Sequence, residues 1–229
     1  MGLIQNGRWV DKWYDTDSSG GKFERQASAF RGHIGADANP RGITTATSNP
    51  QRSAEAIAYP PESGRYHLYV SYACPWAHRA LIFRAIKSLT NHISVSVVDP
   101  LMLENGWEFS GGDSLYGLNY LYQLYLKADP NYEGRVTVPV LWDRITETIG
   151  NNESGDVIRI FNSEFNALTG NNDDYYPEAL RGEIDAVNER IYHDINNGVY
   201  KAGFATSQHV YEEEYDRVFA ALDWLEQHL

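Results

Sequence analysis

Cys74 is the single cysteine of the chain, and its neighbours indicate that the thiol could react. The run YHLYVSY at residues 66–72 is typical of a strand, and Pro75 suits the first turn of a helix because its missing N–H costs nothing there. Cys74 would then lie at a helix N-terminus, where unpaired N–H groups and the helix dipole favour the nucleophilic thiolate. This position predicts a reactive thiol; a small buried side chain without chemistry is the alternative.

A lone thiol limits the redox chemistry that the chain can perform. Without a second cysteine, Cys74 can neither form an intrachain disulfide nor resolve a mixed disulfide by itself. Turnover by thiol–disulfide exchange therefore needs an external thiol, and we expect glutathione or a similar small thiol as co-substrate. A single cysteine also indicates a cytoplasmic protein, because secreted proteins are commonly stabilised by disulfide bonds.

Two further pairs of residues could bind a peptide-like thiol. Val138 precedes Pro139 at the opening of a strand, which makes the pair a candidate for a cis peptide in a tight turn facing the cysteine. Such a turn would leave the Val138 amide for an extended peptide, whereas an ordinary edge-strand proline would not. Glu153 and Ser154 precede an apolar helical run. They could hold a carboxylate and an ammonium group at a helix N-terminus, or simply begin the helix.

Other classes of site are excluded by the sequence. His78 could share a metal with Cys74, but two ligands are too few and the other histidines are dispersed. Gly111 and Gly112 do not open a strand–turn–helix, so no nucleotide motif is present and we expect no permanently bound cofactor. The formal charge of −12 argues against nucleic acid, which needs a basic face, and no apolar run is long enough to cross a membrane.

The elements that would position these residues follow the order of a thioredoxin-like domain, β-α-β and then β-β-α. Between its two halves lies a long insertion at residues 101–134, whose tyrosine-rich piece LYGLNYLYQLYL could form a short helix. The expected strands cover residues 66–72, 92–100, 136–143 and 146–152, and the expected helices run from Pro75 to about residue 89 and over residues 153–166.

Three segments are predicted along the chain, giving an α/β fold followed by an all-α one. Residues 1–64 form a mostly irregular N-terminal arm that wraps over the body, and residues 65–168 form the thioredoxin-like domain. Residues 175–229 begin an all-helical domain, with helices near 177–196 and 211–228. The second helix carries an apolar stripe up to the end of the chain, so we expect this domain to be truncated or the stripe to be covered by another chain. The stripe contains Tyr215, Val218, Phe219, Leu222 and Leu225.

Several motifs together connect the chain with a known family. The segments ACPWAHRA, RVTVPVLWD, NNES and NGVYKAGFA resemble the glutathionyl-hydroquinone reductases, the Xi class of glutathione transferases. The similarity includes GRWVDKWYDTDSSGGKFERQASAF near the N-terminus and thus covers nearly the whole chain. It implies a thioredoxin-like domain that binds glutathione, followed by a helical domain. Members of the family continue past the end of this chain with further helices, so the resemblance implies a homodimer for a full-length form.

The resemblance also implies a role for individual residues. Cys74 would be the nucleophile, and Tyr200 would donate or accept a proton beside the aromatic substrate. Trp107 would cover bound glutathione. The peptide itself would be held by two groups of residues, which are Arg135, Val136, Thr137 and Val138 in one segment and Glu153 and Ser154 in the other.

The activity that the resemblance implies is the glutathione-dependent reduction of aromatic glutathionyl-hydroquinones to hydroquinones, through a mixed disulfide of Cys74 with glutathione. Two alternatives remain open at this point. One is an omega-like cysteine transferase that acts on small disulfides or dehydroascorbate. The other is a glutathione-binding redox protein whose cysteine is modified without catalysing a reaction.

Overall fold

The computed structural model describes residues 2–35 and 59–229, which divide into two units. The first unit comprises Met1–Lys12 and Ser28–Tyr175, and the second comprises Trp13–Ala27 and Tyr176–Leu229. The N-terminal segment therefore contributes to both units. The part of the predicted arm between residues 36 and 58 lies outside the described residues, and the predicted domain boundaries stay predictions.

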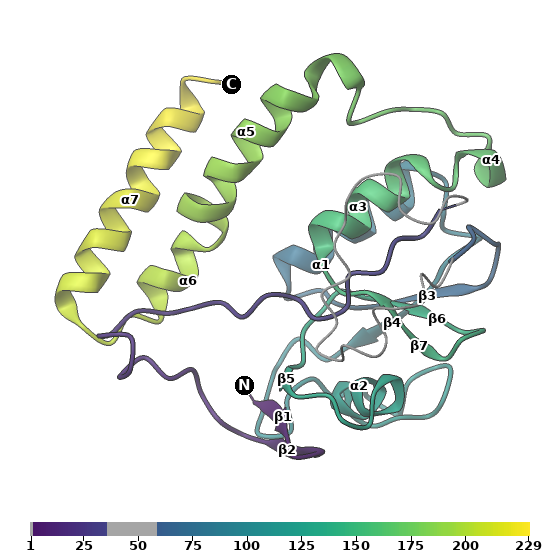
Figure 1. The fold of residues 1–229 in the computed structure, drawn as a ribbon, viewed down its shortest axis with the longest axis horizontal. Coiled ribbons are helices and arrows are strands. Elements are labelled where there is room, and N and C mark those ends of the chain that lie inside the picture. The colour runs from purple at the N-terminus through teal and green to yellow at the C-terminus, as the bar shows by residue number, and fades with distance from the viewer. Residues whose placement is uncertain (1, 36–58) are drawn as a thin grey trace. The chain divides into compact units, whose positions relative to one another are not determined.

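A four-stranded sheet with the order β4-β3-β6-β7 forms the centre of the first unit (Figure 1). The parallel pair joins β3 (Tyr66–Ser71) to β4 (Ser94–Val98), and β3 pairs antiparallel with β6 (Val140–Asp143). Strand β7 (Thr148–Asn151) pairs antiparallel with β6. Helix α1 (Pro75–Ile86) follows β3, and helix α3 (Ser154–Ser163) follows β7. The observed order is therefore the thioredoxin-like one that the sequence predicts.

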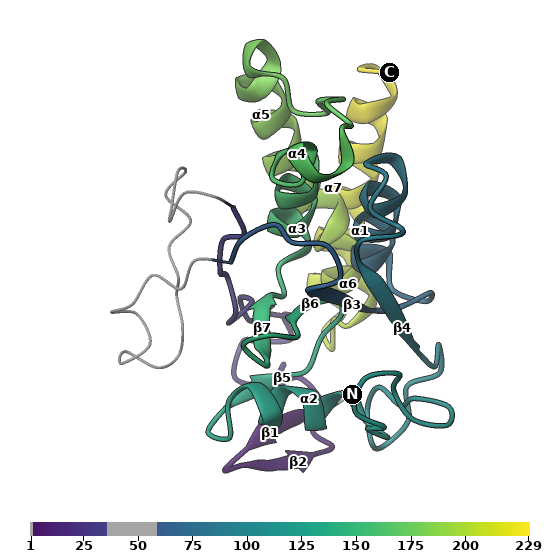
Figure 2. The ribbon, with the colours of Figure 1, turned by 90° about the vertical axis from the view of Figure 1, so that its right-hand side faces the viewer.

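Helices cover both faces of this sheet. Figures 1 and 2 show α1 and α3 on one face of the sheet. Helix α2 (Leu121–Ala128) lies on the other side, together with the hairpin of β1 (Leu3–Gln5) and β2 (Arg8–Val10). Every residue of β3 is buried, which is typical of a strand covered on both faces. The predicted helix to about residue 89 ends earlier, at Ile86, because Ser88 adopts a positive φ of 60° that a helix cannot continue through. The short helix α4 (Asn166–Thr169) follows α3.

Within the arm that the sequence predicts to be mostly irregular, the first residues form a hairpin. Strands β1 (Leu3–Gln5) and β2 (Arg8–Val10) are joined by Asn6 and Gly7, whose φ angles of 51° and 69° are those of the turn that Asn-Gly favours. Strand β1 also pairs with β5 (Gly134–Arg135), so the hairpin forms a second, three-stranded sheet. Further along, Arg31 forms an isolated antiparallel β-bridge with Asn151, the last residue of β7.

The second unit is helical apart from its N-terminal segment. A 3₁₀ turn (Glu178–Leu180), α5 (Arg181–Ile191) and a π-helical turn (Tyr192–Asn196) stand where one helix was predicted. Helices α6 (Gly198–Gly203) and α7 (Gln208–Glu226) follow. The predicted stripe on the last helix is divided, since Val218 is buried whereas Tyr215, Phe219 and Leu222 are exposed. Among the helices of the described residues, none combines the length and apolar character needed to span a membrane.

Candidate active site

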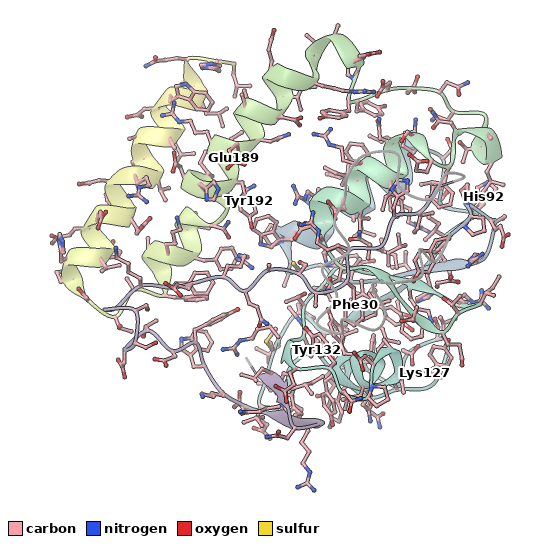
Figure 3. The ribbon with its side chains drawn as sticks, in the orientation of Figure 1. Phe30, His92, Lys127, Tyr132, Glu189 and Tyr192 are labelled. Atoms are coloured by element: carbon pink, nitrogen blue, oxygen red, sulfur yellow. The ribbon has the colours of Figure 1, made fainter. Side chains whose placement is uncertain are left out.

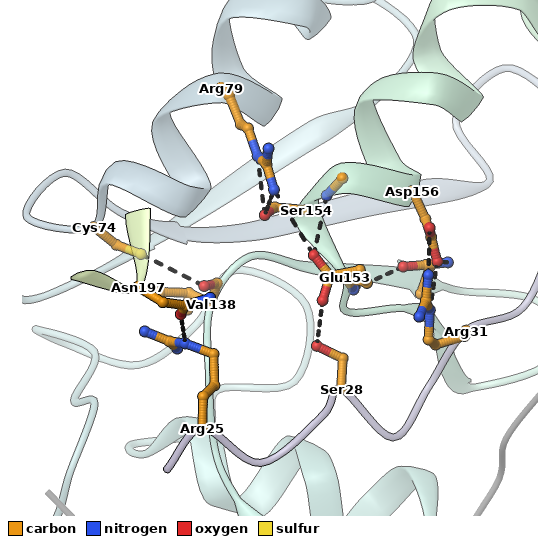
Figure 4. Close-up of polar contacts among 12 residues, drawn as sticks. Arg25, Ser28, Arg31, Cys74, Arg79, Val138, Glu153, Ser154, Asp156 and Asn197 are labelled. Atoms are coloured by element: carbon orange, nitrogen blue, oxygen red, sulfur yellow. Dashed lines mark hydrogen bonds and ion pairs between the residues drawn. The ribbon is translucent and has the colours of Figure 1, made fainter. Parts of the chain in front are cut away.

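Cys74 lies between β3 and α1, where the sequence predicts it. It is the N-cap residue of α1, with extended backbone (φ −99°, ψ 113°), and its N–H donates to the Ser71 carbonyl over 3.1 Å. Pro75 is the first helical residue. Cys74 is partly exposed, and its Sγ lies 3.5 Å from the Val138 carbonyl oxygen (Figure 4). The thiol therefore belongs to a partly exposed residue at a helix N-terminus, the position that favours a nucleophilic thiolate.

The Val138–Pro139 peptide bond is cis, which confirms the prediction from the sequence. Val138 faces the cysteine through its carbonyl group. The Val138 N–H forms no hydrogen bond within the described residues. The preceding residue, Thr137, is fixed instead from the other side, because its carbonyl oxygen accepts from the Tyr125 hydroxyl over 2.8 Å. The backbone just before the cis turn thus lies directly beside the thiol.

Glu153 and Ser154 form the N-terminus of α3, and both side chains are held by other parts of the unit (Figure 4). Glu153 caps the helix by accepting from the Gly155 N–H over 3.2 Å, and its second oxygen accepts from the Ser28 hydroxyl over 2.9 Å. The buried Ser154 hydroxyl accepts from Arg79 Nη2 over 2.7 Å. The helix end therefore presents a carboxylate, a hydroxyl and a nearby guanidinium group in one place.

Ser28, Arg31 and Arg79 are site residues that the sequence interpretation missed. Arg79 lies on α1, the helix that begins at Cys74, and its Nη2 is also 3.8 Å from a Glu153 oxygen. Arg31 donates twice to Asp156, in the first turn of α3, with both distances at 2.7 Å. Each of these pairs joins residues far apart in the sequence, so no local pattern could have predicted them.

Arg135 and Trp107 are held by other contacts of the first unit. Arg135 lies in β5, and its Nη1 donates to the Lys12 carbonyl oxygen over 2.5 Å. The partly buried Trp107 packs against the core, and its carbonyl oxygen accepts from the Leu121 N–H at the start of α2 over 2.9 Å. The buried Val136 continues the chain from Arg135 towards the cis turn. Both residues were predicted to bind glutathione. Arg135 is held by the N-terminal segment, and Trp107 is held within the insertion.

Tyr200 lies in the second unit, on α6. Its ring stacks on Phe23 at a centroid distance of 6.1 Å, and the Arg25 guanidinium lies over the Tyr200 ring at 4.6 Å. Arg25 in turn donates from Nε to the Asn197 side-chain oxygen over 2.5 Å. The N-terminal segment of this unit therefore fixes the ring of Tyr200, while its pairing with Cys74 stays a prediction.

Within residues 2–35 and 59–229, no group of three or more His, Cys, Asp or Glu side chains is arranged to bind a metal ion. Cys74 and its neighbours can instead support the chemistry of a thiol nucleophile that lies beside the backbone of Val138. The polar end of a second helix, α3, lies in the same unit.

This combination of fold and thiol defines a protein of the glutathione transferase type, and the sequence model of the glutathione S-transferase N-terminal domain matches residues 73–164. The chain is 55% identical to glutathionyl-hydroquinone reductase YqjG of Escherichia coli, over 99% of this chain and 68% of that protein. The glutathione-bound structure of YqjG superposes with a TM-score of 0.76 at 53% identity, over 87% of this chain and 63% of that one.

A second solved structure agrees with the comparisons with YqjG. The glutathione S-transferase Xi from Phanerochaete chrysosporium has a TM-score of 0.79 and 46% identity, over 90% of this chain and 67% of that one. The chain thus spans about two thirds of the length of these relatives. It belongs to the glutathionyl-hydroquinone reductases, the Xi class of glutathione transferases.

Proposed function

We propose that this chain reduces glutathionyl-hydroquinones with glutathione, and that Cys74 is the nucleophile of the reaction. Membership of the family supports this substrate class. The observation that carries the proposal is the thiol of the partly exposed residue Cys74 at the N-terminus of α1, 3.5 Å from the Val138 carbonyl oxygen. Thiolates at such positions are stabilised by helix N–H groups and attack sulfur.

The reaction has two steps. In the first, the Cys74 thiolate attacks the glutathionyl sulfur, so that a sulfur–sulfur bond forms and the bond from sulfur to the ring carbon breaks. The electron pair of that bond stays with the ring carbon, which takes up a proton and leaves as the hydroquinone. In the second, the thiolate of another glutathione attacks the mixed disulfide, releasing oxidised glutathione and restoring the Cys74 thiolate. Overall, the thioether sulfur of the substrate and the thiol sulfur of the second glutathione are oxidised to a disulfide, and one ring carbon is reduced.

Glutathione is assigned to the backbone beside Cys74 and to the N-terminus of α3, both in the first unit. The Val138 amide and carbonyl would pair with the peptide backbone, as an edge strand does. Glu153 and Ser154 would bind the ammonium and carboxylate of the glutamyl end, with the N–H groups of α3 favouring the carboxylate. Arg135, Val136 and Thr137 would line the segment before the turn, and Trp107 would cover the peptide.

Tyr200 is assigned as the group that supplies the proton to the leaving ring. Its ring is fixed by Phe23 and Arg25, which leaves its hydroxyl in a defined place relative to the rest of its own unit. We also propose that the enzyme works as a homodimer in a reducing cytoplasm and carries no permanently bound cofactor. These three points follow from the family resemblance and from the single cysteine.

The test of this function is a turnover assay with glutathionyl-benzohydroquinone and glutathione, in which released hydroquinone is measured by chromatography. We expect the parent chain to release hydroquinone and Cys74→Ser to release almost none, with Ser63→Ala as a folded control. Trapping with one equivalent of substrate should yield a glutathione adduct on Cys74 by mass spectrometry. Equal turnover by the parent and Cys74→Ser would refute the assignment. Faster turnover of a small disulfide or of dehydroascorbate would favour the omega-like alternative.

A further inference from the structure

Tyr125 is a fully buried tyrosine whose hydroxyl connects two segments of the candidate active site. It lies on α2, and its hydroxyl donates to the Thr137 carbonyl oxygen over 2.8 Å. The same oxygen accepts from the Thr137 N–H over 3.2 Å and from the Asn152 side-chain amide over 3.0 Å. The Thr137 hydroxyl is a fourth neighbour, 3.3 Å from the same oxygen. A phenol has one donor and two acceptor positions, so these contacts leave none of them unused. Burial raises the pKa of Tyr125, which keeps the donated proton in place.

The contacts with Thr137 determine where the next residue points. In extended backbone the N–H and C=O groups of successive residues face opposite sides. Both groups of Thr137 face Tyr125, whereas the carbonyl of Val138 faces Cys74 and accepts from its thiol. The Tyr125 hydroxyl therefore bonds to the backbone of Thr137 on one side of this segment, as a neighbouring strand would. The Cys74 thiol contacts the carbonyl of Val138 on the other side.

The contact with Asn152 extends the connection to the polar end of α3. Asn152 directly precedes Glu153, and its side-chain oxygen accepts from the Phe30 N–H over 3.0 Å. Asn152 also donates its own N–H to the Phe30 carbonyl oxygen over 2.9 Å. One hydroxyl group thus joins the backbone beside Cys74 to the residue that begins the Glu153–Ser154 segment.

The ring of Tyr125 cannot easily change its position. It contacts Phe30 edge-to-face at 5.9 Å and Tyr132 at 5.1 Å, and these two residues stack on each other at 5.5 Å. Phe30 and Tyr132 are labelled in Figure 3. Aromatic pairs at these separations hold one another in place. The hydroxyl is therefore a fixed point to which both segments of the site are attached.

We propose that Tyr125 is a positioning residue for glutathione: its hydroxyl sets the distance between the Val138 backbone edge and the Glu153–Ser154 helix end, so that one tripeptide reaches both. The proposal rests on the proposed function, since it assumes that glutathione occupies these two segments. Tyr125 itself touches no reacting atom. Its contribution is to the affinity for the whole tripeptide and to the rejection of a thiol that lacks the glutamyl end.

The test compares Tyr125→Phe with the parent in direct binding of glutathione and of cysteinylglycine, which lacks the glutamyl residue. Loss of the hydroxyl leaves the Thr137 groups and the Asn152 amide without this partner. We expect glutathione to bind roughly tenfold more weakly. Cysteinylglycine should be much less affected, so the preference of the protein for glutathione should fall. The alkylation rate of Cys74 by iodoacetamide should stay unchanged.

Tyr66→Phe is the matched control, because Tyr66 is also fully buried and donates its hydroxyl to a backbone carbonyl, that of Pro60, over 2.8 Å. A merely structural role for Tyr125 predicts that both variants lose stability and keep the preference for glutathione, and that outcome would overturn the proposal. If Tyr125→Phe does not fold, Asn152→Ala removes the contact between the Asn152 amide and the Tyr125 hydroxyl and should also reduce the preference. A parent chain that binds no glutathione would refute the proposed function instead.

Discussion

Arg79 donates two hydrogen bonds to the hydroxyl of Ser154, from Nε over 3.1 Å and from Nη2 over 2.7 Å. Arg79 lies on the helix that begins at Cys74, and Ser154 lies at the start of the helix that carries the candidate glutamyl subsite. The two helix N-termini of the site are thereby tied together by one side chain. This contact has consequences for binding that can be measured.

Replacement of Arg79 by methionine should weaken glutathione binding. The change keeps most of the side-chain stem but removes the charged group that holds Ser154 and lies 3.8 Å from Glu153. Hydrogen bonds from charged groups contribute about 1.5–3 kcal/mol, and partial exposure of Arg79 reduces this, so we expect a loss of about 1 kcal/mol in binding. Isothermal titration with glutathione measures it. Arg84→Met, in the last turn of the same helix, is the control, and an equal loss in that variant would contradict the prediction.

The thiol of Cys74 should be alkylated faster in the folded chain than in the unfolded one at pH 6. Its place at the N-terminus of α1 favours the thiolate, which is the species that iodoacetamide modifies. The measurement is the rate of adduct formation by mass spectrometry in buffer and in urea. The unfolded chain serves as its own control. A slower rate in the folded chain would favour the alternative in which the cysteine is not catalytic.

His67 should make the stability of the chain depend on pH. Its ring nitrogens lie 2.6 Å from the Ser94 hydroxyl and 2.9 Å from the Ser96 hydroxyl, and burial lowers its pKa from 6.5 to about 4. Between these two values the unfolded chain binds more protons than the folded one. Stability is therefore complete above about pH 6.5 and falls as the pH drops towards 4, by up to about 3 kcal/mol.

The measurement for His67 is the free energy of unfolding in urea at several pH values. His67→Gln keeps an amide that can bond to the two serines but does not titrate, so it should flatten the curve in this range. The same substitution at the exposed His228 should leave the slope as it is in the parent. A parent curve that is already flat between pH 4 and 6.5 would refute the assignment.

Gly198 should not tolerate a side chain. A Cβ atom at this position of α6 would lie 2.7 Å from a Val218 methyl group on α7, and Val218 is short and β-branched, so it cannot move aside. We expect Gly198→Ala to destabilise the second unit by about 1–3 kcal/mol, the usual cost of overpacking. Thermal unfolding measures the loss. Because Val218→Ala makes room, the double variant should recover part of it, and additive losses would argue against this contact.

Much of the fold could be predicted because the signals are local. The strand before Cys74 and the helix after it follow from adjacent residues, and so does the cis bond at Val138–Pro139. The helix end at Ile86 was placed too late, since the positive φ of Ser88 carries no strong signal in the sequence. The hairpin turn at Asn6 and Gly7 was a local signal that the interpretation of the N-terminal arm overlooked.

The sequence by itself determined that a single thiol stands at the start of a helix in a thioredoxin-like domain, because composition and periodicity act over a few neighbouring residues. Only the tertiary structure decided what surrounds that thiol. Tyr125 meets Asn152, and Ser28 meets Glu153, through hydrogen bonds between residues that are far apart along the chain. Such contacts form only when packing of the sheet and helices brings the segments together, and no pattern of neighbouring residues in the sequence reveals them beforehand.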